Sequence, residues 1–305
     1  MKYEPISGSP EPVGGAEGSL PWSPMVVIVA YGSEDQLAAS LQTLGSGIPV
    51  VVVDNGRSDR AQCICQSSGA TYVRPHTNIG FGAAVNVALR GHRVPGSDVL
   101  LLNPDARLRV TDLTKMRDEL YGSSNLAAVG PRLVNPDGGE QKAVWPIPSP
   151  WSALSGVIGA AELLSRRRFV SGAVLLLRGT AIDSVGIFDE RFFLYAEETD
   201  WQLRALRAGW RVGLASDATA VHLSGGTSVD PVRRQLLFDA SAERFARKWY
   251  GTVGWQLFRT ASMLAALRRL IMAGDIETRM TQRRALAHFW RGPIRCAQSL
   301  DDMLE

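Results

Sequence analysis

The sequence predicts an α/β protein built on a mostly parallel sheet with helices on its faces, followed by a basic helical segment. From Met25 onward, short apolar runs alternate with amphipathic segments, which is the pattern of such a sheet. The run Val99–Leu102 is continuously apolar, as a strand covered on both faces would be. Toward the C-terminus, the segment from Arg244 to Arg295 contains eleven Lys or Arg residues and only two acidic residues.

Length and composition predict one elaborated domain with an appendage. The chain has 305 residues and is 45% hydrophobic, so it can bury a large core. Residues 1–24 are rich in Pro, Gly and Ser and lack a basic start, which predicts a flexible tail and not a signal peptide. The expected organisation is therefore a tail at 1–24, an α/β domain at 25–230 and a basic amphipathic helical region at 231–305.

The cysteines indicate a reducing compartment, and the hydropathy pattern predicts no membrane span. Cys63, Cys65 and Cys296 are odd in number and lack zinc-site spacing, which favours buried free thiols. No stretch reaches the roughly 18 uninterrupted apolar residues of a membrane span.

The first strand and helix are predicted from apolar spacing and capping signals. The strand Met25–Ala30 is followed by a capping-box pattern, Ser33 and Gln36, which opens a helix that Gly45 is placed to end. The apolar face of that helix consists of Leu37, Leu41 and Leu44.

Later elements follow the same alternation. Further strands are expected at 50–53, Thr71–Val73, Val99–Leu102, 169–177, 212–214 and 220–222, and helices at 83–90 and 111–120. Gly172 lies inside the run 169–177, where a ligand or another backbone can approach closely.

One carboxylate stands just past the run Val99–Leu102. Pro104 cannot extend a ladder because it lacks an N–H, so Asp105 is expected at the carboxyl edge of its strand, facing a crevice. The alternative is a solvated Asp in an ordinary strand exit.

Two other segments carry polar residues beside predicted elements. Asp54 and Asn55 end the second strand, where a carboxylate can bind a base or a ribose hydroxyl, although a simple turn with Gly56 explains them equally. Asn78 and Gly80 precede a helix whose first N–H groups can face an anion, but the segment does not match the dinucleotide fingerprint.

An acid cluster and a histidine complete the set of chemical candidates. Thr199 and Gln202 read as a capping box, which places Asp200 in the first helical turn and leaves Glu197 and Glu198 in the preceding loop. A general base is one interpretation of these two glutamates, and a solvated loop is the other. His222 suits a metal or phosphate ligand, although a lone His is more often a hydrogen-bonded core residue.

The segment 244–295 carries a net charge of +9, while the remainder of the chain carries −6. Among its arginines stand aromatic and aliphatic residues at helical spacing: Trp249, Tyr250, Trp255, Phe258, Met263, Leu264, Leu267, Leu270 and Ile271. Such a segment can lie in the interface of an anionic membrane, or it can pack on the core with a solvated basic face. A nucleic-acid partner is not expected, because the rest of the chain is acidic and shows no recognition motif.

The ordered motifs resemble the family 2 glycosyltransferases of the GT-A fold, in their bacterial rhamnosyltransferase-like branch. The resemblance covers about residues 25–228 and rests on segments 26–31, 52–56, 78–86, 102–105, 170–173, 186–200 and on His222. The chain departs from the family's pattern at Ala30 and Gly32, which replace Thr and Asn, at Asn103, which replaces an acid, and at Leu223, which replaces a second His.

The resemblance implies a set of site residues. Donor-binding positions would be Ala30, Tyr31, Asp54, Asn55, Asn78, Gly80, Asn103, Pro104, Asp105 and Gly172. Asp105, with His222, would bind Mg²⁺ or Mn²⁺ on the donor diphosphate. Glu198 occupies the place of the family's catalytic Asp, with Glu197 and Asp200 as supporting acids.

The resemblance also implies a reaction and a place in the cell. The reaction would be inverting transfer of a sugar to a glycan or glycolipid acceptor in cell-envelope polysaccharide synthesis. The expected sugar is L-rhamnose, from dTDP-rhamnose. UDP-galactofuranose or a UDP-hexose is the alternative donor. The expected location is the cytoplasm, peripheral at the inner face of the plasma membrane. A nucleotidyltransferase and a non-catalytic scaffold with the same fold are competing readings.

Overall fold

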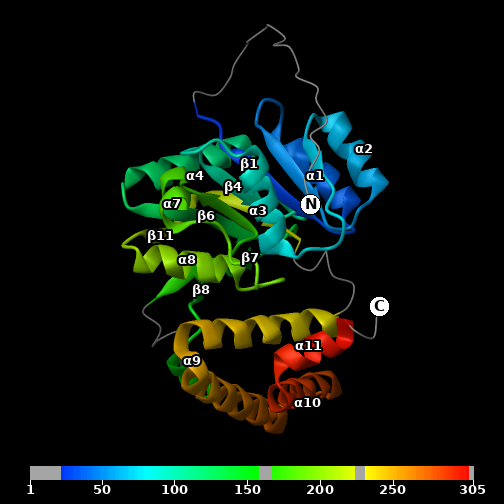
Figure 1. The fold of residues 1–305 in the computed structure, drawn as a ribbon, viewed down its shortest axis with the longest axis vertical. Coiled ribbons are helices and arrows are strands. Elements are labelled where there is room, and N and C mark those ends of the chain that lie inside the picture. The colour runs from blue at the N-terminus through cyan, green and yellow to red at the C-terminus, as the bar shows by residue number, and fades with distance from the viewer. Residues whose placement is uncertain (1–21, 158–166, 224–230, 302–305) are drawn as a thin grey trace, which may run out of the picture.

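The structure, a computed structural model, describes residues 22–157, 167–223 and 231–301. It confirms the α/β class: a mixed sheet with helices on both faces, and a group of C-terminal helices beneath it (Figure 1). Most of the expected tail, residues 1–24, lies outside the described residues. Trp22, inside them, donates a hydrogen bond from its indole to the Asp98 carboxylate at 2.8 Å.

The sheet is mostly parallel at one end and mixed at the other. Its strands are β1 (Met25–Ala30), β2 (Val50–Asp54), β3 (Thr71–Val73), β4 (Val99–Leu102), β5 (Ala106–Leu108), β6 (Leu126–Val134), β7 (Glu140–Gln141), β10 (Val174–Leu177) and β11 (Arg211–His222). Their order is β3-β2-β1-β4-β10-β6-β11-β5, with β7 on β6. Strand β10 runs antiparallel to both β4 and β6. Because of this reversal, the beginning of β10 meets the end of β4.

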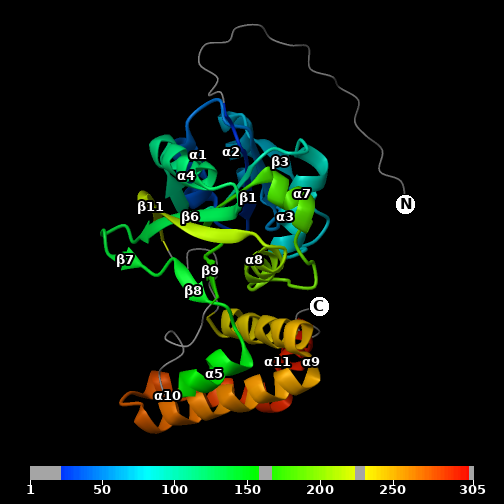
Figure 2. The same cartoon turned by 90° about the vertical axis from the view of Figure 1, so that its left-hand side faces the viewer.

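The two faces of the sheet carry different helices (Figure 2). On one face lie α1 (Glu34–Leu44), α2 (Asp59–Ser68) and α4 (Val110–Gly122), and on the other lie α3 (Phe81–His92), α7 (Gly179–Val185) and α8 (Glu197–Arg207). Strand β1 supplies both, since Val26 and Ile28 pack toward α1 while Val27 and Val29 pack toward α3. The predicted helix face of Leu37, Leu41 and Leu44 is buried, and Gly45 ends that helix.

Three local predictions are wrong in detail. Ser33 precedes α1 but its side chain makes no capping hydrogen bond; Glu34 and Asp35 offset the helix dipole instead. The run 169–177 is two strands, β9 (Arg168–Val170) and β10, because β9 pairs with β8 (Val144–Pro146) and β10 pairs with β4. The short strands at 212–214 and 220–222 are one strand, β11, with an irregular register between them.

The thiols follow the prediction only in part. Cys65 is buried under the sheet, and burial raises the pKa of its thiol to about 11. Cys63 is exposed, because it lies on the opposite side of α2, so the expectation of a buried thiol is wrong there.

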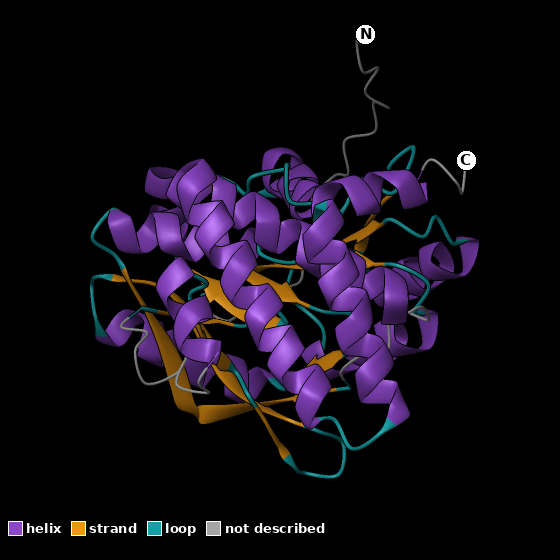
Figure 3. Ribbon diagram, turned by 90° about the horizontal axis from the view of Figure 1, so that it is seen from below, coloured by secondary structure: helices purple, strands orange, loops and turns teal. Residues whose placement is uncertain are grey.

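The C-terminal helices form a layer below the α/β part, together with α5 (Pro150–Val157) (Figure 2). In the view from below, helices cover much of the sheet (Figure 3). The C-terminal helices are α9 (Pro231–Met272), α10 (Ile276–Arg291) and α11 (Pro293–Asp301). Helix α9 is interrupted at Gly251, whose φ is +66°. Its first part packs on the α/β part through Phe245, Trp249 and Tyr250. In the described part of the chain, no helix is long and apolar enough to cross a bilayer.

Candidate functional site

Three segments that are distant in sequence meet where β4 ends. The Asn103 N–H donates to the carbonyl of Ala173 at 2.8 Å, which extends the pairing of β4 with β10. The Leu223 N–H donates to the carbonyl of Asp105 at 3.1 Å. The predicted strand end therefore adjoins both the Gly172 turn and the end of β11.

Asp105 and His222 lie together, as the resemblance implies. The Asp105 side chain is buried, its Oδ1 has no hydrogen-bond partner, and His222 Nε2 lies 3.4 Å from that oxygen. On its other side, His222 Nδ1 lies 3.0 Å from Gln141 Oε1. The Gln141 amide nitrogen donates to the His222 carbonyl and to Asn135, which leaves Oε1 as an acceptor.

This hydrogen-bond pattern indicates which imidazole nitrogen of His222 carries a proton. Because Gln141 Oε1 accepts, Nδ1 carries the proton, and in the neutral ring Nε2 then presents a lone pair toward Asp105. A carboxylate oxygen and an imidazole nitrogen placed side by side in this way suit a divalent metal ion. Sequence reasoning missed Gln141, since a two-residue edge strand leaves no pattern.

The helix that carries the acid cluster begins earlier than the sequence predicts. Helix α8 starts at Glu197 after Ala196, so the placement of Glu197 and Glu198 in a loop is wrong. The Gln202 side chain does not close a capping box; it exchanges two hydrogen bonds with the Val170 backbone, at 2.8 and 2.7 Å. Asp200 does lie in the first turn.

The backbone just before α8 is strained. Tyr195 and Ala196 have φ angles of +67° and +69°, a region that residues with a Cβ rarely adopt. Such strain persists where surrounding structure holds it, and it clusters at functional sites. Here it turns the chain so that Glu197 and Glu198 point inward.

Glu198 lies against the Gly172 turn. A Cβ at Gly172 would stand 3.1 Å from Glu198 Cγ, so the glycine leaves room for this side chain. Burial raises the pKa of Glu198, although backbone N–H groups at Thr199 and Gly172 oppose the rise. Its Oε2 is buried and has no hydrogen-bond partner.

Glu197 is more deeply enclosed than its neighbour. It is 5% exposed, and Gly82 of α3 packs against its side chain. Burial and the neighbouring Glu198 carboxylate raise the pKa of Glu197 well above the usual range. Its Oε2 also lacks a partner, so this carboxyl is favoured in its protonated form.

Asp200 is fully buried and fully paired. Its Oδ1 accepts from the Trp249 indole at 2.9 Å and lies 2.5 Å from Lys248 Nζ, and its Oδ2 accepts from Arg204 at 3.1 Å. Lys248 also reaches Asp189 at 2.7 Å. The sequence marks Lys248 only as one of many basic residues, and nothing in its spacing indicates that it points to these acids.

The predicted base-reading residues line the ends of β1 and β2. Asp54 Oδ1 accepts from the Gly56 N–H, and Oδ2 accepts from the Ser58 N–H and the Tyr72 hydroxyl. These bonds are those of a carboxylate that stabilises a turn, which was the alternative interpretation of Asp54. They leave one lone pair on Oδ1 available. The Asn55 N–H donates to the Ala30 carbonyl, and Tyr31 remains exposed at the strand end.

The loop before α3 is built on close backbone contacts. Asn55 donates to the Gly80 carbonyl at 3.1 Å, and Asn78 accepts from the Gly80 N–H at 3.0 Å. A Cβ at Gly80 would lie 2.4 Å from the Phe193 carbonyl oxygen, and its φ is +83°. The loop therefore joins Asn55, one of the predicted donor-binding residues, to the segment that leads into α8.

Family models match most of this chain. The model described as glycosyl transferase family 2 matches residues 25–185, more than half of the chain. A second, described as glycosyl transferase family group 2, matches residues 153–298.

Relatives of known activity are similar at low identity. An N-acetylglucosaminyl-diphospho-decaprenol L-rhamnosyltransferase of Mycobacterium tuberculosis is 27% identical over 76% of this chain and 88% of its own length. A low-salt glycan biosynthesis hexosyltransferase of Haloferax volcanii is 25% identical over 65% of this chain and 66% of its own length, just under two thirds. A galactofuranosyltransferase of Mycolicibacterium smegmatis is 23% identical over 68% of this chain and 72% of its own length.

Solved structures show the fold. A mannosyltransferase of Pyrobaculum calidifontis, in complex with GDP-Man and Mn²⁺, aligns with a TM-score of 0.54 at 14% identity, over 90% of this chain and 83% of its own. Glucosyl-3-phosphoglycerate synthase of Mycobacterium tuberculosis, in complex with Mn²⁺ and UDP, aligns with a TM-score of 0.52 at 13% identity, over 74% and 76%. These likenesses confirm the predicted GT-A fold. With the motifs in order along it and the family model spanning more than half of its length, the chain belongs to glycosyl transferase family 2.

Proposed function

We propose that this chain transfers a sugar, with inversion, from a nucleoside diphosphate donor to an acceptor hydroxyl. The observation that carries the proposal is the pair of buried, unpartnered carboxylate oxygens, Asp105 Oδ1 and Glu198 Oε2. The hydrogen bond between Asn103 and Ala173 brings their segments together at one edge of the sheet. One carboxylate suits a cation beside the leaving group, and the other suits a proton acceptor.

Glu198 is the proposed general base. Its raised pKa makes it a stronger proton acceptor than an exposed carboxylate, and its free oxygen is available to an acceptor hydroxyl. General-base catalysis of this kind contributes about 10²–10⁴-fold to a rate. Glu197 supports the site by packing against α3, and Asp200 by fixing the first turn of α8.

The residues present fit a divalent metal ion. Asp105 supplies an unpartnered carboxylate oxygen and His222 a ring nitrogen whose other side is held by Gln141. Among the described residues, no cluster of three or more His, Cys, Asp or Glu side chains forms a complete cage, so the diphosphate and water would complete the coordination. When bound, Mg²⁺ or Mn²⁺ would neutralise charge on the departing diphosphate.

The donor nucleotide is proposed to lie along the ends of β1, β2 and β4. Tyr31 offers an exposed ring for stacking, and Asp54 retains a lone pair for a base N–H. The diphosphate would follow from Asn78 and Gly80 toward Asn103. The other proposed donor contacts are Ala30, Asn55, Pro104 and Gly172.

L-rhamnose from dTDP-rhamnose is the donor sugar we propose, with a lipid-linked glycan of the cell envelope as the acceptor. The support is the similarity to the diphospho-decaprenol rhamnosyltransferase over 88% of that protein's length. The galactofuranosyltransferase and hexosyltransferase relatives support a UDP-sugar as the second candidate.

The outer face of the C-terminal helices is proposed to contact the inner face of the plasma membrane from the cytoplasm. After Gly251, exposed aliphatic residues recur at helical spacing: Val253, Leu257, Leu264, Leu267 and Ile271. Residues 252–298 contain eight Arg and only two acids, a net charge of +6. Pairing of two copies along this face would bring like charges together, whereas an anionic lipid surface complements them. We propose that the α/β domain ends at residue 230 and that the helical region begins at residue 231, as the sequence predicts.

Replacement of Glu198 by Gln tests the assignment of the base. The variant should lose transfer by about 10²–10⁴-fold and still bind the nucleotide sugar, because the amide keeps the shape but not the basicity. Glu197→Gln is the matched control and should retain most of its activity. Near-normal turnover of Glu198→Gln would overturn the role.

Asp105→Ala tests the cation site separately. Metal-dependent donor binding should be lost, as measured by calorimetry with and without Mn²⁺. Unchanged affinity would remove the metal assignment. Hydrolysis of the nucleotide sugar by the wild type without acceptor distinguishes an enzyme from a scaffold.

A further inference from the structure

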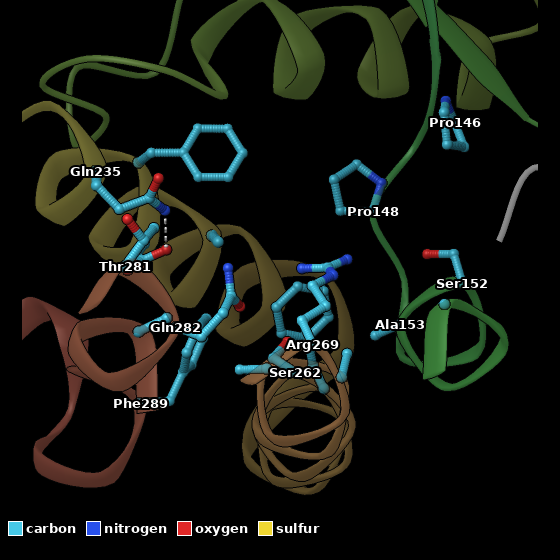
Figure 4. A pocket seen from close by; sticks show the side chains of 18 residues that line it. Pro146, Pro148, Ser152, Ala153, Gln235, Ser262, Arg269, Thr281, Gln282 and Phe289 are labelled. Atoms are coloured by element: carbon cyan, nitrogen blue, oxygen red, sulfur yellow. Dashed lines mark hydrogen bonds between the residues drawn. The ribbon is translucent and has the colours of Figure 1, made fainter. Parts of the chain in front are cut away.

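A cavity of about 400 Å³ lies outside the site described above, between α5, both parts of α9 and α10 (Figure 4). Its volume falls within the range of small-molecule sites. Much of its wall is apolar, including Pro146, Pro148, Phe238, Phe258, Ala266 and Phe289.

The buried carboxylate in the cavity wall already has hydrogen-bond partners. Asp239 is 3% exposed, its Oδ1 accepts from Gln235 at 2.9 Å, and its Oδ2 lies 3.2 Å from His288 Nδ1. A buried carboxylate satisfied in this way does not call for a polar ligand. The surface left to an occupant is therefore mainly hydrocarbon.

The cavity adjoins the helix that carries the proposed base. The ring of Phe238, in the cavity wall, contacts the ring of Tyr195 edge to face, with centroids 5.7 Å apart. Tyr195 precedes Glu198 by three residues, at the strained turn into α8. On another side, Pro146 pairs with Arg168 in β9, the strand that leads to the Gly172 turn beside Glu198.

A cation lies beside the residues of the cavity wall and near Tyr195. Arg234 precedes the wall residue Gln235 and is exposed. It is close enough to Tyr195 to act on the pKa of that hydroxyl, lowering it against the larger effect of burial. An anionic group between Glu198 and the cavity would meet this guanidinium.

We propose that the cavity holds the hydrocarbon chain of a lipid-linked acceptor, whose phosphate group meets Arg234 and whose hydroxyl reaches Glu198. This inference rests on the proposed function for the existence of such an acceptor. An apolar cavity, a nearby cation and a proton acceptor match the hydrocarbon chain, the phosphate and the sugar of such an acceptor.

Ligand binding without sugar transfer tests the cavity. Farnesyl diphosphate should bind the full chain more tightly than methyl diphosphate, by about tenfold or more, because burial of even two methylene groups corresponds to that factor. Ala285→Trp, which fills the cavity, should remove this preference. Ala287→Trp is the matched control, since Ala287 lies on the same helix and faces solvent. Calorimetry measures both affinities, and thermal unfolding checks that the variants fold, with Ala266→Phe as the substitute if Ala285→Trp does not.

Several outcomes would overturn the proposal. Equal affinity for the two diphosphates would do so, as would a preference that survives in Ala285→Trp and Ala266→Phe. Binding of monomeric dihexanoyl phosphatidylglycerol in the cavity, without binding of farnesyl diphosphate, would assign it to a bilayer lipid instead. If chain-dependent binding is confirmed but Glu198→Gln still transfers sugar, the cavity stands and the proposed base fails.

Discussion

The two glutamates at the start of α8 show how neighbouring carboxyls acquire different roles. Glu197 is buried and Glu198 is partly buried, and each has one buried oxygen without a hydrogen-bond partner. Glu197 is held against Gly82, whereas Glu198 stands beside the Gly172 turn, where the end of β4 and the beginning of β10 meet. The carboxyl at this edge is therefore the one that we propose exchanges a proton with the substrate.

Burial of Glu198 predicts the pH dependence of transfer. A general base works only when deprotonated, and the pKa of Glu198 is raised, so kcat should fall as the pH drops through a value above the ordinary Glu pKa of about 4.3. The measurement is kcat against pH at saturating substrates. In Glu197→Gln the fall should stay at about the same pH, because Glu197 is itself favoured in its protonated, uncharged form and burial is what raises the pKa of Glu198. A fall at the ordinary value in the wild type would contradict this account.

At the residue scale, the sequence singled out the acids but not their partners or the start of the helix that carries two of them. Asp105 and His222 could be anticipated because each ends an apolar strand, and strand ends meet at sheet edges. Gln141 could not, since it gains its position from a two-residue strand. The start of α8 was missed because Gln202 bonds to the Val170 backbone, a tertiary contact that overrides a local capping pattern.

At the scale of elements, Lys248 and Trp249 join α9 to α8. Lys248 lies between Asp189 and Asp200, and Trp249 adds a hydrogen bond to the second of these acids. The side chains of Arg191 and Lys248 hold the pKa of Asp189 well below its usual range. A depressed carboxyl pKa stabilises the fold above the unfolded pKa, and this contribution is lost as the pH falls.

Replacement of Lys248 by Met should therefore destabilise the protein. Asp200 is fully buried and would lose one of its three partners, which we expect to lower the free energy of unfolding by about 1–3 kcal/mol. Arg60→Met is the control, because the Arg60–Asp35 pair is exposed on both sides and should change stability by less than about 1 kcal/mol. Urea unfolding at pH 7 measures both, and equal effects would contradict the coupling role of Lys248.

Elements with continuous apolar runs were predictable, and those defined by pairing were not. Strands β1, β2 and β4 are buried on both faces and appear as Val- and Leu-rich runs. The reversal of β10 could not be anticipated, because direction within a sheet leaves no trace in such a run. The same holds for β5, β7 and β8, which have two or three residues each.

At the scale of the whole molecule, charge and apolar surface are distributed unevenly. The net positive charge lies on the C-terminal helices, and the large aliphatic side chains exposed after Gly251 lie among those arginines. Other aromatic residues of this region are used internally: Trp255 is buried and packs against Phe258 and Phe289. The sequence left packing and membrane contact as alternatives, and the structure shows that the packing interpretation holds for Trp249, Tyr250 and Trp255.

The exposed aliphatic face predicts binding to anionic vesicles. The protein should sediment with vesicles that contain phosphatidylglycerol but not with pure phosphatidylcholine, and added salt should weaken the association. Leu264→Glu should reduce binding by about tenfold or more, since a buried Leu contributes about 1.5–3 kcal/mol. Val94→Glu, at an exposed apolar position of the α/β part, is the control for charge. Equal binding of the two variants would contradict a contact through α9.

Gly251 connects the part of α9 that contacts the α/β domain to the part that carries the exposed aliphatic residues. The residues before it are fixed to the acids of α8, and the roughly 30 Å of helix after it carries the face proposed to rest on lipid. In the proposed membrane contact, the turn at Gly251, together with the packing of α10 against both parts of α9, would set the inclination of the sheet over the bilayer and the height at which an acceptor hydroxyl is presented.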